Sequence, residues 1–143
     1  MALLSALFVW RQIVWFNRQL KLDTLFKISE INRELLIFGI ERPELLEILG
    51  NGMPTSDEQR RYLQLWINQA DIVYQAASQK LLTKEVSAAL TRDIGEFFRK
   101  DGVILYWKEV EGYYSEGLRR FLGRAMMAPH QSTIKGIPPD FIE

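Results

Sequence analysis

The first sixteen residues constrain this chain most, because they are too apolar to remain in water as an isolated helix. Residues 2–10 are apolar except for Ser5, and residues 13–16 resume the apolar run after Arg11 and Gln12. On a helical wheel the apolar side chains point in nearly every direction, while the polar ones gather on one side. A helix of this kind is buried in protein or in lipid. We therefore expect residues 1–19 to form an attachment segment.

This segment is short for a transmembrane helix, which needs about 20 predominantly apolar residues. Trp10 and Trp15 are amphipathic rings of the type that gathers at membrane–water interfaces, and the long stem of Arg11 can reach lipid headgroups. These features favour partial insertion, or a short span that ends near Phe16. The alternatives are burial in a partner protein and burial against the rest of the chain. The predicted membrane or partner contacts are Leu3, Leu7, Trp10, Ile13, Val14, Trp15 and Phe16.

The charges that follow the apolar run predict how the chain is oriented. Arg18, Lys21 and Lys27 precede the main domain, and basic residues beside a membrane segment favour the cytoplasmic side. We therefore expect a membrane-associated protein whose helical domain lies on the cytoplasmic side. No basic region precedes the apolar run and no small-residue cleavage site ends it, so we expect the segment to stay in the mature chain.

Composition argues against several classes of function. The 18 basic residues balance the 18 acidic ones, and no basic stripe is present to follow a phosphate backbone. The chain has no cysteine, and its one histidine, His130, has no carboxylate nearby at ligand spacing. Neither a phosphate-binding glycine loop nor a nucleophile-elbow motif occurs. We therefore expect no enzymatic activity, no cofactor, no structural metal and no nucleic-acid partner.

Helical periodicity runs through the rest of the chain, and no strand-like alternation interrupts it. Apolar residues recur at three- and four-residue steps from Leu20 to Phe38, so residues 2–38 are predicted to form one long helix that ends at Gly39 and Pro43. Further helices are expected over residues 44–49, 57–79, 83–99 and 103–126. The sequence thus predicts an all-α fold in which a long N-terminal hydrophobic helix continues into a bundle of about four helices. The bundle spans residues 20–126, and residues 127–143 form an extended C-terminal tail.

Aromatic residues supply two further candidates. Tyr106, Trp107, Tyr113 and Tyr114 cannot all face one core, because adjacent helical residues point about 100° apart. We therefore expect these four residues to form a second interface. Alternatively, the chain is a soluble helical module that binds a hydrophobic ligand between its helices, with Trp66 and Trp107 lining the pocket.

Three segments give the chain a resemblance to known families. They are Arg-Pro-Glu-Leu-Leu at residues 42–46, Arg-Tyr-Leu-Gln-Leu-Trp-Ile-Asn at residues 61–68, and the stretch from Phe97-Phe98 to Trp107. The arrangement is similar to uncharacterised bacterial families with one N-terminal membrane segment and an all-helical cytoplasmic domain. These families have no established activity, so the resemblance implies an architecture only. Our leading hypothesis is a non-enzymatic accessory or scaffolding subunit that docks through its N-terminal helix onto membrane lipid or a membrane-protein complex, forming a hetero-oligomer in the second case.

Overall fold

The computed structural model describes residues 2–50 and 52–128, with side chains described from Ser5 onward. Residues 129–143, which include His130 and most of the predicted tail, lie outside this part of the chain. All regular elements of the described residues are helical, so the predicted all-α class and the helical bundle are confirmed. The helices are α1 (Ala2–Glu41), α2 (Pro43–Leu46), α3 (Asp57–Ser78), α4 (Lys84–Phe98), α5 (Asp101–Val110) and α6 (Glu116–Met127), with 3-10 turns at Glu47–Leu49 and Glu111–Tyr113.

Among the described residues, no helix is sufficiently apolar over a long enough stretch to cross a membrane. This finding does not support the short span considered for residues up to Phe16. The physical reason lies in the sequence, because Arg11, Gln12, Asn17 and Arg18 interrupt the apolar run.

Helix boundaries follow from capping and from one proline. The α1 helix passes through Gly39 and ends at Glu41, because Arg42 precedes Pro43 and adopts a non-helical conformation with φ −129°. Ser56 and Thr83 begin α3 and α4, and each side chain accepts a hydrogen bond from the backbone N–H three residues later. The start of α3 therefore lies where the sequence predicts it.

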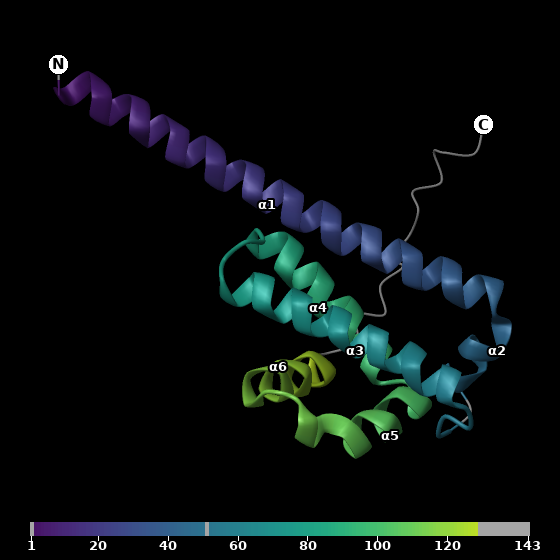
Figure 1. Cartoon of the computed structure of the whole chain (residues 1–143). Helices are drawn as coiled ribbons and strands as arrows, with labels where there is room; N and C mark the ends of the chain where they lie inside the picture. Colours follow the sequence, from purple (N-terminus) through teal and green to yellow (C-terminus); the bar gives the residue numbers. More distant parts are fainter. Residues whose placement is uncertain (1, 51, 129–143) are drawn as a thin grey trace, which may run out of the picture.

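The single helix predicted over residues 103–126 is wrong, because the structure divides this stretch into α5 and α6. A 3-10 turn follows Val110, and Ser115 then caps α6 by accepting a hydrogen bond from the Leu118 N–H. Ser115 competes for the backbone as an N-cap residue, and this local preference outweighs the continuous apolar periodicity. The chain turns here, so α5 and α6 both pack beneath α3 and α4 (Figure 1).

The second half of α1 packs against α3, and two polar side chains fix the register between these helices. The Tyr62 hydroxyl donates to the Leu35 carbonyl oxygen at 3.2 Å, and Gln69 Nε2 donates to the Ile28 carbonyl oxygen at 3.1 Å. The two donors and the two acceptors are each seven residues apart and in opposite chain order. This pairing requires the two helices to be antiparallel, as Figure 1 shows.

Changing Tyr62 to Phe is expected to lower the free energy of unfolding by about 1 kcal/mol, because it removes one buried hydrogen bond and retains the ring. The ring also contacts Phe38 and Trp66, at centroid distances of 6.1 and 6.3 Å. Urea denaturation followed by circular dichroism measures the change. Tyr113 is 89% exposed, so Tyr113→Phe is the matched control and should leave the midpoint unchanged. Equal midpoints for the two variants would show that the hydroxyl of Tyr62 does not stabilise the fold.

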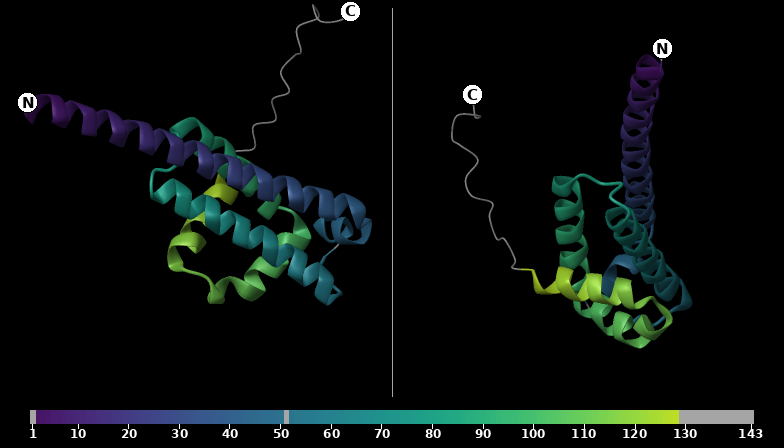
Figure 2. Two further views of the ribbon diagram at one scale, coloured as in Figure 1. Left: turned by 45° about the horizontal axis from the view of Figure 1, so that its top comes forward. Right: turned by 90° about the vertical axis from the view of Figure 1, so that its left-hand side faces the viewer.

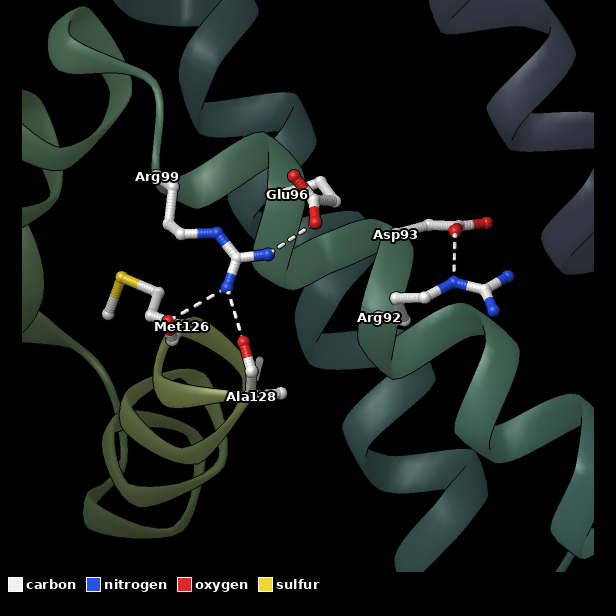
Figure 3. Close-up of polar contacts among 6 residues, drawn as sticks. All are labelled: Arg92, Asp93, Glu96, Arg99, Met126 and Ala128. Carbon is white, nitrogen blue, oxygen red and sulfur yellow. Dashed lines mark hydrogen bonds and ion pairs between the residues drawn. The ribbon is translucent and has the colours of Figure 1, made fainter. Parts of the chain in front are cut away.

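The α4 and α6 helices pack closely because small residues meet at their crossing. Gly95 faces the Ala125 carbonyl oxygen, and a side chain at Gly95 would overlap that atom. Arg99, at the end of α4, pairs with Glu96 and donates to the carbonyl oxygens of Met126 and Ala128 at 2.9 Å each (Figure 3). The guanidinium thereby satisfies carbonyl groups that the end of α6 leaves unpaired.

Candidate functional site

The N-terminal part of α1 projects away from the bundle (Figures 1 and 2). Every described side chain from Ser5 to Asp23 is exposed, and partial burial starts at Thr24. We call residues 5–23 the projecting segment. At 1.5 Å per residue it is about 28 Å long. The surface available for contact is therefore a free-standing helix rather than one face of the bundle.

The projecting segment exposes an unusual amount of apolar surface. Its eight large apolar side chains between Leu7 and Phe16 are each 49–67% exposed. On soluble monomers, a large continuous apolar surface of this kind marks an interaction site. The residues are Leu7, Phe8, Val9, Trp10, Ile13, Val14, Trp15 and Phe16.

Basic and aromatic side chains lie together on one side of the projecting segment. Trp10, Arg11, Val14, Trp15 and Arg18 line a shallow depression of about 270 Å³. From Ser5 to Leu22 the only ionisable side chains are basic, and the first acidic residue is Asp23. Tryptophan beside arginine is the combination that suits an interface between apolar and anionic surroundings.

The structure brings most of the predicted contact residues together on this segment. Leu7, Trp10, Ile13, Val14, Trp15 and Phe16 all lie on it and are exposed. The side chain of Leu3 lies outside the described residues. Phe8 and Val9 extend the same surface, and the continuous apolar run in the sequence already contains them.

The second predicted interface is wrong for two of its four residues. Tyr106 and Trp107 are buried, and the Trp107 ring packs against Phe98 at 5.9 Å between centroids. Burial raises the pKa of Tyr106, whose ring also lies 5.9 Å from the Arg60 guanidinium carbon. Because α5 is short and packs against α3 and α4, adjacent residues can both reach the core.

Tyr113 and Tyr114 lie on the turn after α5. Tyr113 is exposed, whereas Tyr114 is half-buried and donates to Asn68 Oδ1 at 3.4 Å. Burial is also the main cause of the raised pKa of Tyr114. Only Tyr113 therefore presents its whole side chain to a partner.

The alternative hypothesis predicts a ligand pocket lined by Trp66 and Trp107, and only one of these two residues lines a cavity. Trp66 lines a cavity between α1, α3 and α4, while Trp107 belongs to the core below. The cavity also contains Gln69, a residue that the sequence reasoning missed. The available signal was its position, because Gln69 follows Tyr62 by seven residues on the inner face of α3.

No family model, curated protein or solved structure matches this chain. The resemblance drawn from residues 42–46, 61–68 and 97–107 therefore stays a prediction. Function has to be inferred from the side chains themselves.

Within residues 2–50 and 52–128, no group of histidine, cysteine, aspartate or glutamate side chains is arranged to hold a metal ion. Ion pairs such as Arg60–Glu109, at 2.9 Å, are partly exposed and link neighbouring helices. The described surface thus offers apolar and cationic contact along the projecting segment.

Proposed function

We propose that this chain is a non-enzymatic accessory or scaffolding protein that attaches to a membrane or a membrane-protein complex through its projecting segment. The observation that carries the proposal is the run of eight large apolar side chains that the fold leaves in water. In this arrangement the bundle, from Thr24 onward, stays outside the apolar phase and is free to make further contacts.

The energy available for attachment is large compared with the stability of a small domain. Full burial of a large apolar side chain stabilises by about 1.5–3 kcal/mol, and the projecting segment offers eight that are 49–67% exposed. Isolated helices in water also lack tertiary contacts to hold them. A lipid or protein environment would supply both the burial and the helix stabilisation.

The geometry of α1 favours attachment to something outside the chain. No glycine or proline occurs between Ala2 and Phe38, so α1 has no hinge that would let the projecting segment fold back onto the bundle. Tyr62 and Gln69 of α3 hold the other half of the helix in place. The projecting segment is therefore presented as a rod in a fixed direction.

Charge supports lipid headgroups as part of the contact. Arg11, Arg18 and Lys21 are the basic residues that precede Asp23, and each basic residue close to an anionic membrane surface contributes about 1 kcal/mol. The same positive bias favours the cytoplasmic side for the bundle.

Cell fractionation tests the proposal. The full chain is expected in the membrane fraction and a chain lacking residues 1–18 in the soluble fraction, because the deletion removes the eight exposed apolar side chains and keeps the residues that pack on α3. Circular dichroism of the shortened chain checks that the bundle still folds. If both chains are equally soluble and monomeric, the proposal fails.

Extraction of the membrane fraction separates the two forms of attachment. Crosslinking before detergent treatment, followed by mass spectrometry, identifies a membrane-protein partner if the projecting segment binds one. Binding of the purified chain to protein-free vesicles shows that lipid is sufficient.

A further inference from the structure

A cavity of about 70 Å³ lies between α1, α3 and α4, beside the part of α1 that packs in the bundle. Its floor is α3, through Trp66 and Gln69, and its walls are α1 and α4. The remaining lining is mostly apolar, and Asp93 on α4 is exposed to solvent at its rim. The lining residues are Asn32, Trp66, Gln69, Ala70, Val73, Leu90, Asp93, Ile94, Phe97 and Phe98.

Two buried polar atoms of the lining residues have no hydrogen-bond partner within the part of the chain that the structure describes. They are Trp66 Nε1, which can only donate, and Gln69 Oε1, which can only accept. Gln69 is only 3% exposed. Buried polar atoms in folded proteins are nearly always paired, so these two atoms leave one donor and one acceptor at the cavity for a bound group to satisfy.

The orientation of the Gln69 amide is fixed by its other contacts. Its Nε2 donates to the Ile28 carbonyl oxygen at 3.1 Å and to Asn32 Oδ1 at 3.0 Å. A carbonyl oxygen can only accept, so the amide nitrogen must face α1 and Oε1 is left without a partner. The unpaired acceptor is therefore a property of the fold.

The chemistry of the lining defines the class of ligand. The indole N–H requires an acceptor and the amide oxygen requires a donor, and a hydroxyl group supplies both. Asp93 is the only charged residue of the lining, and it pairs with Arg92 at 3.5 Å (Figure 3). No basic side chain of the lining is available to neutralise an anion. A neutral hydroxyl group therefore fits these atoms better than a carboxylate or a phosphate does.

The volume limits how much of a ligand fits inside. An apolar cavity of about 150 Å³ accommodates the six carbon atoms of benzene, so about 70 Å³ holds roughly three non-hydrogen atoms. Leu90, Ile94 and Phe97 would contact the carbon atoms of such a group. The rim at Asp93 and Asn32 allows a longer molecule to extend outward.

We propose that this cavity is a binding site for the hydroxyl end of a small, neutral, mostly apolar molecule, which donates to Gln69 Oε1 and accepts from Trp66 Nε1. This site is separate from the projecting segment and does not depend on the proposed attachment. Water has the same hydrogen-bonding chemistry and would fill the site when no organic hydroxyl is present. The test therefore has to distinguish these two sources.

The test uses 1-propanol as probe and the full chain, labelled with ¹⁵N and kept in solution without lipid. Among the four tryptophans, the Trp66 indole signal and the Gln69 side-chain amide signals are expected to shift saturably. For a molecule of four non-hydrogen atoms the dissociation constant can be no lower than about 0.04 mM. Propionate, an anion of similar size, should not shift them.

Two variants with a matched control check the assigned atoms. Trp66→Phe removes the indole N–H and keeps an aromatic ring, so propanol binding read at Gln69 should weaken about 3- to 10-fold. Trp10→Phe makes the same change on the projecting segment and should leave binding unchanged. Ala70→Val fills the cavity and should abolish the saturable shift. Leu90→Phe enlarges another lining side chain and serves the same purpose if Ala70→Val fails to fold.

Several outcomes would overturn the site. Equal, non-saturating shifts of all four indole signals would show only a solvent effect. Equal binding of propionate, or unchanged binding in both cavity-filling variants, would place the probe elsewhere. A water molecule that still gives an NOE to the Trp66 indole at saturating propanol would show a water site only.

Discussion

Replacing Gly102 with alanine is expected to destabilise the bundle by about 3 kcal/mol or more, which is a large share of the stability of a domain this size. Gly102 is buried in the first turn of α5, and a Cβ atom there would overlap the Ile48 carbonyl oxygen. The Gly52 carbonyl oxygen would lie 2.7 Å away. Both neighbours are backbone atoms, so no side-chain rotation can relieve the overlap.

Urea denaturation of the full chain measures this effect, with Gly123→Ala as the control. Gly123 lies within α6 and has open space where a Cβ would be built. Alanine is the better helix former by about 1 kcal/mol, so Gly123→Ala should raise the midpoint while Gly102→Ala lowers it. Similar midpoints for both variants would mean that the carbonyl groups of Ile48 and Gly52 move aside at little cost.

Gly102 also shows what a single sequence cannot reveal about packing. In the sequence, Asp101-Gly102 is typical of a helix break, whereas the structure ends α4 at Phe98 and places both residues in the first turn of α5. The close approach of the loop before α3 is a long-range contact, and no local pattern predicts it. Gly39 shows the converse, because it was expected to end α1 but instead makes room for the Tyr62 hydroxyl.

The sequence predicts the buried residues of helices that have one buried face, but it predicts those of the central helix, α3, only in part. Steps of three and four residues from Tyr62 predict an inner face of α3 that includes Leu65 and Val73 and omits Leu63 and Ile67. The structure buries Leu63 and Ile67 and leaves Leu65 exposed. The α3 helix contacts α1 on one side and α5 and α6 on another, so two apolar stripes overlap in one periodic pattern.

The two candidate sites, the projecting segment and the cavity, also differ in how far the sequence predicts them. The projecting segment is a local run of apolar residues, so the sequence alone located it. The cavity depends on Asn32, Gln69 and Asp93, which come from three helices and share no spacing in the sequence. Only the antiparallel register of α1 and α3 brings Asn32 and Gln69 together.

Placing a charge on the projecting segment, by Val14→Asp, is expected to weaken binding to anionic vesicles at least tenfold. An aspartate at the centre of a membrane helix costs about 3 kcal/mol relative to valine, and the cost is smaller near the headgroups. The change should leave the bundle folded, because Val14 is half exposed and contacts no other helix of the described chain. Flotation with vesicles that contain phosphatidylglycerol measures the bound fraction.

Ile40→Asp provides the matched control, since Ile40 is an exposed apolar residue of the same helix at the opposite end. It adds the same charge and should leave vesicle binding unchanged. Equal losses for the two variants would indicate a general charge effect, and no loss for Val14→Asp would rule out lipid insertion by this surface. A third outcome is that Val14→Asp lowers membrane association in cells, while neither the unchanged protein nor this variant binds vesicles. The projecting segment then binds a membrane protein. Attachment would then depend on a protein groove that accepts Trp10, Val14 and Trp15.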